Sequence, residues 1–242
     1  MMIEKVIKIK SRSPLRGTGG FFADDILSFL KNLELNIDLP NDIEVMNPFK
    51  DPAALDICSQ FYKKYYSDNR QRKIIIGINP GRFGAGVTGV PFTDPIRLKT
   101  ECEIDNSWSP KPELSSLFVY DFIKAYGGVK NFYSDFYISA VSPLGFTRHG
   151  KNLNYYDDKE LQQNIREFAV DCIYKQLEFG LNRNVAFCLG EGKNFKYLSK
   201  LNSEEKFFNR IIPLSHPRFI MQYKLKKKDE YIETYLEKLN TA

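Results

Sequence analysis

Apolar residues recur every three or four positions in five segments of the chain, and this spacing predicts five amphipathic helices. The second segment begins at Asp51-Pro52, an N-cap residue followed by proline, which is typical of a helix start. Helices with one apolar face need a flat apolar surface to pack on. The five faces are Phe22/Ile26/Phe29/Leu30/Leu33, Ala54/Ile57/Phe61/Tyr65, Leu114/Leu117/Phe118/Phe122, Leu161/Ile165/Phe168/Cys172 and Ile232/Tyr235/Leu236/Leu239.

Four short runs rich in β-branched and aromatic residues supply that surface. They are nearly unbroken in hydrophobicity, as expected of strands buried on both faces, and cover residues 73–78, 136–141, 185–189 and 211–214. Strands that alternate with helices predict an α/β fold, a three-layer helix-sheet-helix sandwich with a short, mainly parallel central sheet. Without repeats or low-complexity tracts, residues 1–242 are expected to form a single domain.

Composition narrows the class of protein. The 242 residues are 43% hydrophobic and carry a formal charge of +5, which permits a nucleic-acid partner without proving one. The longest aliphatic run, Ile74–Ile76, is far shorter than a membrane span, and residues 1–6 lack the features of a signal peptide, so we expect a cytoplasmic protein. The four cysteines include no C-x-x-C pair and are expected to be reduced apolar residues, with no metal bound.

Ligands of parallel sheets bind at the carboxyl ends of the strands. The first such end carries the segment Gly77-Ile78-Asn79-Pro80-Gly81-Arg82-Phe83-Gly84-Ala85-Gly86-Val87-Thr88-Gly89-Val90-Pro91-Phe92. Gly84, Gly86 and Gly89 satisfy the G-x-G-x-x-G dinucleotide pattern, but that pattern requires a strand that runs directly into a helix. Here Asn79-Pro80 intervenes, and Pro91 and Pro95 are expected to prevent a helix.

Two further strand ends carry polar residues. After the second run, residues 142–152 are expected to form a polar loop that contains Arg148, Lys151 and Asn152, whose amide has the donors and acceptor needed to read the edge of a base. After the last run comes Ser215-His216-Pro217-Arg218-Phe219, which places one of two histidines at a third carboxyl end.

These three segments resemble the motifs of uracil-DNA glycosylases, and most closely those of the single-strand-selective monofunctional branch. Residues 77–81 with 88–92 resemble its first motif, Pro143-Leu144-x-Phe146 with Gly150-Lys151-Asn152 its middle segment, and residues 215–217 the start of its last motif. The resemblance covers residues 77–219 and implies the uracil-DNA glycosylase-like fold. Arg82 in place of a proline, Thr93 in place of a glycine and Arg218-Phe219 after His216-Pro217 indicate a divergent sub-branch.

The resemblance also implies the roles of the site residues. Asn79 would hold the attacking water, His216 would stabilise negative charge on the uracil O2, and Asn152 would read the Watson–Crick edge. Phe92 would stack on the flipped base, and Gly81 would leave space beside C5, so that 5-hydroxymethyluracil could also be accepted. Gly77, Ile78 and Pro80 complete the expected base pocket.

The chemistry is consistent with these roles. Cleavage of the glycosidic bond builds positive charge on the sugar and negative charge on the base, which calls for an anion stabiliser and an oriented water. The base must first be flipped out of a duplex. Phosphates would be bound by cations beside the loops, with Phe219 or Arg218 as a wedge between bases. The candidates for DNA contact are Arg82, Arg148, Lys151, Arg218, Phe219 and Lys224.

We therefore predict a monomeric, monofunctional uracil-DNA glycosylase of base excision repair that acts on DNA without metal or other cofactor. No lysine occupies a motif position as a Schiff-base nucleophile, so strand cleavage is not expected. The alternatives are a non-catalytic protein that binds a nucleobase or damaged DNA, an oxidoreductase that uses Gly84, Gly86 and Gly89, or a glycosylase for a deaminated purine or mismatched thymine.

Overall fold

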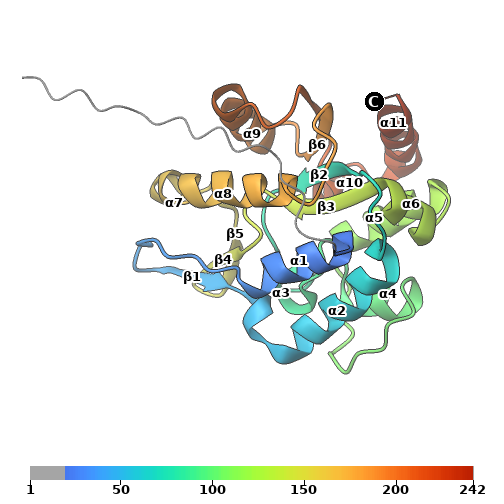
Figure 1. Ribbon diagram of the computed structural model, residues 1–242, viewed down its shortest axis with the longest axis horizontal. Helices are drawn as coiled ribbons and strands as arrows, with labels where there is room; N and C mark the ends of the chain where they lie inside the picture. The colour runs from blue at the N-terminus through green and yellow to red at the C-terminus, as the bar shows by residue number, and fades with distance from the viewer. Residues whose placement is uncertain (1–19, 242) are drawn as a thin grey trace, which may run out of the picture.

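The computed structural model describes residues 20–241 (Figure 1). The expectation made for residues 1–6 lies outside this range. No helix in residues 20–241 is both long enough and apolar enough to cross a membrane.

The core is a parallel sheet of four strands in the order β3-β2-β6-β7. The strands are β2 (Lys73–Gly77), β3 (Phe136–Ala140), β6 (Val185–Leu189) and β7 (Arg210–Leu214), each within one residue of the run that predicted it. Ile75 pairs with Ile138 on one side and with Phe187 on the other. The predicted parallel sheet is confirmed, and all its carboxyl ends lie along one edge.

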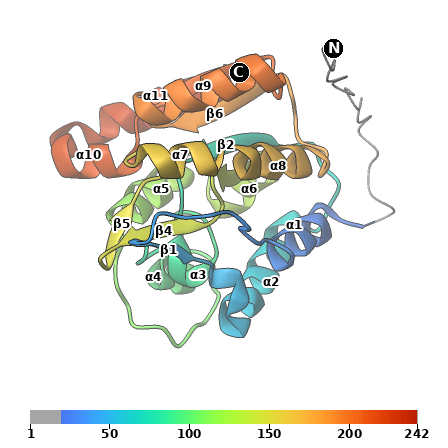
Figure 2. The ribbon, with the colours of Figure 1, turned by 90° about the vertical axis from the view of Figure 1, so that its left-hand side faces the viewer.

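Alternating side chains of β3 show that helices cover both faces of the sheet. Tyr137 faces α1 (Phe22–Lys31) and α8 (Arg166–Leu177): its hydroxyl donates to Gln176 Oε1 at 3.1 Å, and its ring meets Phe22 edge-on. Phe136 points the other way, onto Phe132 of α6 (Val129–Asp135) and Tyr126 at the end of α5 (Leu114–Ala125). The three-layer sandwich predicted from the sequence is therefore present (Figures 1 and 2).

The predicted helices are found, with one correction. Helix α2 (Pro52–Tyr66) begins at the predicted Asp51 cap, whose carboxylate accepts from the Ala53 N–H, and α11 (Lys228–Asn240) ends the chain. The face predicted as one helix over residues 161–172 belongs to two, α7 (Lys159–Asn164) and α8. Ile165 lies between the two helices with ψ of −4°. Because its side chain is fully buried, the helical spacing of apolar residues continues across the junction, and the sequence therefore predicted one helix.

A second, antiparallel sheet replaces the polar loop expected after β3. It consists of β1 (Ile43–Met46), β4 (Gly145–Arg148) and β5 (Lys151–Leu153), in the order β1-β4-β5, and lies below α7 in Figures 1 and 2. Strands β4 and β5 are joined by two residues, His149 and Gly150, with φ of +50° and +67°. Two successive positive φ angles suit a tight hairpin, but Asn-Gly or Asp-Gly is its usual signal, so His-Gly did not reveal the turn.

The remaining helices are short or lie near the sheet edge, and one of them overturns an expectation. Pro95 was expected to oppose a helix, but it is the first residue of α4, where a missing N–H costs nothing, and Asp94 caps that helix by accepting from the Arg97 N–H at 2.9 Å. The elements are η1 (Pro48–Lys50), α3 (Ala85–Thr88), α4 (Pro95–Thr100), α9 (Lys193–Glu205), α10 (Pro217–Tyr223) and η2 (Leu225–Lys227). Because α3 has four residues and stops at Gly89, no long helix follows β2 to hold a pyrophosphate.

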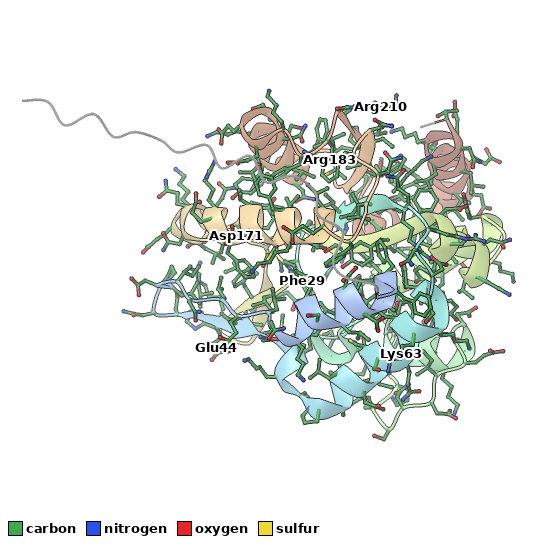
Figure 3. All side chains as sticks on the ribbon, viewed as in Figure 1. Phe29, Glu44, Lys63, Asp171, Arg183 and Arg210 are labelled. Carbon is green, nitrogen blue, oxygen red and sulfur yellow. The ribbon has the colours of Figure 1, made fainter. Side chains whose placement is uncertain are left out.

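The charged side chains labelled in Figure 3, among them Glu44, Lys63 and Asp171, are exposed, whereas Phe29 of α1 is buried. All four cysteines are free and buried, as predicted, and burial raises the pKa of the Cys58 thiol to about 12. They therefore pack as small apolar residues.

One buried cation joins the segments that lead into β2. Arg72 is completely buried, and its guanidinium lies 5.0 Å from the ring centre of Phe22 and 4.7 Å from that of Tyr66. Its Nε donates to the Tyr133 carbonyl at 2.8 Å, and its two terminal nitrogens donate to Asp68 at 2.8 and 3.0 Å. A single side chain thus ties the end of α2 and helix α6 to the first residues of the central strand.

Replacing Arg72 by Met should lower the free energy of unfolding by about 3 kcal/mol, because the Tyr133 carbonyl and Asp68 lose their charged donor. Urea denaturation measures this change. Arg70→Met is the matched control: Arg70 is 67% exposed and lies 4.0 Å from the same carboxylate, so it should change stability by no more than about 0.5 kcal/mol. Equal effects of the two substitutions would contradict the role assigned to Arg72.

Candidate active site

A cavity of about 110 Å³ lies at the carboxyl ends of β2, β3 and β7. It brings together all eight residues predicted to catalyse the reaction or to bind the base, although they come from three separate stretches of the chain. These are Gly77, Ile78, Asn79, Pro80, Gly81, Phe92, Asn152 and His216.

The Asn79 amide is held by the backbone that follows β5. Its Nδ2 donates to the Leu153 carbonyl at 3.1 Å, and its Oδ1 accepts from the Tyr155 N–H at 3.0 Å. These two bonds fix which end of the amide carries the oxygen. Because an amide oxygen accepts two hydrogen bonds, Oδ1 keeps one acceptor position for another donor.

Tyr155 extends this arrangement into the sheet. Its buried hydroxyl donates to Asn194 Oδ1 at 2.7 Å, and Asn194 Nδ2 donates to the Leu189 carbonyl at the end of β6 at 2.9 Å. The hairpin and the sheet edge are therefore connected by buried hydrogen bonds. Neither Tyr155 nor Asn194 was singled out in the sequence, because their polar groups are used inside the protein and neither residue belongs to a motif.

The orientation of the Asn152 amide is also fixed. Asn152 is exposed on β5 and projects into the cavity, where its Oδ1 accepts from the Arg82 N–H at 3.0 Å. Its Nδ2 then faces Gly81, since a Cβ added to that glycine would lie 3.5 Å away from it. The amide therefore offers one remaining acceptor position and a free donor group to a ligand.

His216 is a neutral hydrogen-bond donor in this geometry. It is the N-cap of α10, and its Nδ1 accepts from the Arg218 N–H at 3.1 Å, which leaves the proton of the neutral ring on Nε2. Burial, and next the charge of Arg218, lower its pKa to about 4. An imidazole of this kind donates a hydrogen bond at neutral pH without bringing a charge.

Phe92 lies between the imidazole and the end of β2. Its ring centre is 6.1 Å from that of His216, and a Cβ on Gly77 would lie only 3.2 Å from the Phe92 ring. Residue 77 must therefore be small for the ring to sit there. Phe92 also has a positive φ of 52°, which is unusual for an aromatic residue and typical of functional sites.

Glu113 is a cavity residue that the sequence reasoning missed. A Cβ on Gly81 would lie 3.4 Å from its Oε1, and a Cβ on Gly84 would overlap its carboxylate. Burial, and next the repulsion of Asp94, raise the pKa of Glu113 to about 7, while Arg218 opposes the shift. No local signal marks Glu113, because the glycines that make room for it lie much earlier in the chain.

A wider groove of about 830 Å³ adjoins the cavity and shares Asn152, His216 and Arg218 with it. Four of the residues predicted to contact DNA line this groove: Arg82, Lys151, Arg218 and Phe219. Cations lie close to aromatic rings here: the guanidinium of Arg82 is 4.5 Å from the ring centre of Phe83, and Nζ of Lys193 is 5.5 Å from that of Tyr156. Such a surface suits a polyanion with stacked bases.

The other two residues predicted to contact DNA line neither cavity. Arg148 is paired with Asp42 and Asp158, each at 2.8 Å, so it links β4 to the segments that precede β1 and α7. Lys224 lies exposed at the end of α10.

The segment after His216, which carries the two candidates for the wedge, forms helix α10. Helix α10 presents Phe219, which is 42% exposed, and Tyr223, which is 71% exposed, with their ring centres 5.7 Å apart. Within residues 20–241, no group of three or more His, Cys, Asp or Glu side chains is placed to hold a metal ion.

Two comparisons with known proteins show what the chain is similar to. The profile of the uracil DNA glycosylase superfamily matches residues 63–240. The crystal structure of wild-type SMUG2 from Pedobacter heparinus is 49% identical in sequence and superposes with a TM-score of 0.89, covering 92% of this chain and 99% of that one.

The imidazole of His216 should titrate near pH 4. His149→Ala removes the other histidine of the chain, so one imidazole signal remains in an NMR titration. Because the pKa of an unfolded histidine is about 6.5, the folded protein binds fewer protons than the unfolded protein between pH 6.5 and pH 4. The contribution of His216 to the free energy of unfolding is therefore complete above pH 6.5 and is lost as the pH falls from 6.5 to 4. A titration midpoint near pH 6.5 would contradict the claim that His216 is a neutral donor.

Proposed function

The chain belongs to the uracil DNA glycosylase superfamily, and on that basis we propose that it hydrolyses the N-glycosidic bond of deoxyuridine in DNA and leaves an abasic site. The observation that carries the proposal is the convergence of two backbone-fixed amides, Asn79 and Asn152, with a neutral His216 in one cavity. Each group matches a separate requirement of this reaction.

Asn152 is suited to selecting uracil over cytosine. Uracil presents an acceptor at O4 and a donor at N3, and cytosine presents the reverse. With Oδ1 held by the Arg82 N–H, the amide accepts from N3–H and donates through Nδ2 to O4. A flip of the amide, which would suit cytosine, would place Nδ2 against the Arg82 N–H and break that bond.

Phe92 and His216 would hold the base by its face and its O2 edge. Stacking on an aromatic ring contributes about 1–3 kcal/mol per base, which offsets part of the cost of flipping the nucleotide into the cavity. As the bond to the sugar breaks, negative charge collects on the base, and the Nε2–H of His216 would stabilise it by donating to O2. A donor that is already neutral does not have to lose a proton to the base.

Asn79 would position the attacking water. Its remaining Oδ1 acceptor position can hold one hydrogen of a water molecule, which directs an oxygen lone pair toward C1′. An amide is a weak base, but the sugar cation of a dissociative transition state reacts readily with an oriented water. The proton is then passed to solvent or to the base.

The groove beside the cavity would bind the DNA strand, with Arg82, Lys151 and Arg218 contacting phosphates and Phe219 contacting a neighbouring base. Lys224 extends the cationic surface at the end of α10, whereas Arg148 is occupied by Asp42 and Asp158. The mechanism uses no metal ion, needs one copy of the chain, and forms no covalent intermediate, so the protein would act as a monofunctional enzyme of base excision repair.

The decisive experiment incubates the protein with labelled single- and double-stranded oligonucleotides that carry uracil, 5-hydroxymethyluracil, hypoxanthine, xanthine or a G·T mismatch, with and without EDTA, followed by hot alkali. We expect alkali-dependent cleavage at uracil that EDTA does not affect. Asn79→Ala and His216→Ala should each lower kcat by about 10²–10³-fold. Cleavage of no substrate, with binding retained, would leave a non-catalytic base-binding protein.

Asn152→Asp should lower kcat/KM for uracil at least about 100-fold, because the second carboxylate oxygen would face O4, where the amide offered a donor. The Arg82 N–H would still find an acceptor, so the fold should be unaffected. The same assay measures the change, with the exposed Asn240→Asp as the matched control. Unchanged uracil release by Asn152→Asp would show that another residue reads the base.

A further inference from the structure

The side chain of Glu113 makes no capping hydrogen bond to α5, the helix that it precedes. Glu113 is the N-cap of α5, a position where an acidic side chain is stabilised by the free N–H groups. The backbone N–H is held by Asp94 at 2.9 Å, and the side chain is turned into the cavity over Gly81 and Gly84. Within residues 20–241 the carboxylate accepts no hydrogen bond.

The position of Glu113 relative to Asn152 indicates which part of a bound base it would face. Oε1 of Glu113 and Nδ2 of Asn152 lie 3.4 and 3.5 Å from the same point, the place of a Cβ on Gly81. If Asn152 Oδ1 binds N3–H and Nδ2 binds O4, Glu113 lies at the O4 end of the base. The ring atom that follows C4 on that side, away from N3, is C5.

We propose that Glu113 is the residue that reads the substituent at C5 of the base, rejecting the methyl group of thymine and accepting the hydroxyl of a 5-hydroxymethyl group. This inference rests on the proposed function. Gly81 leaves the space beside C5 open on the side of β2, and the Glu113 carboxyl closes it on the side of α5 with a polar group. A methyl group there would remove water from the carboxyl without replacing its hydrogen bonds.

The hydroxymethyl group suits this position in either protonation state of Glu113. The charged groups that act on the carboxyl are Asp94, which precedes α4, and Arg218 of α10, and with burial they place its pKa at about 7. An ionised carboxylate accepts from the hydroxyl, and a protonated carboxyl donates to it. Uracil, with hydrogen at C5, leaves room for a water at the same place.

The test compares kcat/KM for thymine, uracil and 5-hydroxymethyluracil in otherwise identical single-stranded oligonucleotides. In Glu113→Ala the thymine-to-uracil ratio should rise at least about tenfold, and the 5-hydroxymethyluracil-to-uracil ratio should fall at least about tenfold. Glu113→Gln keeps the size of the side chain and a bond to the hydroxyl, so both ratios should stay within about threefold of the wild-type ratios. Glu233→Ala, on an exposed face of α11, is the matched control.

The outcomes separate this inference from the proposed function. If the wild-type protein releases uracil and Glu113→Ala leaves both ratios unchanged, the role of Glu113 is overturned and the glycosylase remains. If the wild-type protein releases no uracil, both proposals fail. Should Glu113→Ala not fold, as judged by circular dichroism, Glu113→Asp takes its place, since withdrawing the carboxyl by one methylene should also raise the thymine-to-uracil ratio.

Discussion

The candidate site depends on one pair of hydrogen bonds at the Asn79 amide, which donates through Nδ2 to the Leu153 carbonyl and accepts through Oδ1 from the Tyr155 N–H. These bonds join the tip of the central strand to the chain that leaves the hairpin. They place Asn152, one residue before Leu153, opposite the loop that begins at Pro80. Through Tyr155 and Asn194 the same connection reaches the end of β6. The hairpin is thereby fixed to the parallel sheet, and the amides that would face a base are held by backbone groups rather than by mobile side chains.

Burial in the cavity favours the neutral forms of its two shifted titratable groups. Burial lowers the pKa of His216 to about 4 and raises that of Glu113 to about 7, so both groups shift toward their neutral forms. The permanent cations Arg82, Lys151 and Arg218 line the outer groove, where they are suited to hold a phosphate backbone. Under the proposed function, binding of the strand and chemistry at the base would take place in two adjoining spaces that share Asn152, His216 and Arg218. The anion that forms on the departing base would be the main new charge in the inner one.

Local sequence patterns predicted the central sheet and most of the helices, because buried strands and amphipathic helices have distinct spacings of apolar residues. The four strands of the sheet were found within one residue, as was the Asp51 start of α2. The hairpin was missed because its turn is His149-Gly150, and the start of α4 was misread because proline also suits the first turn of a helix. The motif residues predicted to form the base pocket line one cavity, whereas Glu113, which also lines it, was not predicted. Its position depends on contacts with two distant glycines, which no local pattern contains. Likewise, the ion pairs of Arg148 with Asp42 and Asp158 join it to residues outside its own motif segment, so no local pattern indicated them.

The most direct test of this account is a crystal structure of the protein bound to a single-stranded oligonucleotide that carries 2′-fluoro-deoxyuridine, whose glycosidic bond resists cleavage. The account predicts that the uracil stacks on Phe92, with Asn152 Nδ2 within hydrogen-bond distance of O4, His216 Nε2 within the same reach of O2, and Glu113 beside C5. The Asn79 amide should keep its bonds to Leu153 and Tyr155 and hold a water near C1′. A base bound elsewhere in the groove, or an Asn152 amide turned away from it, would contradict the claim that backbone-fixed amides build the recognition site.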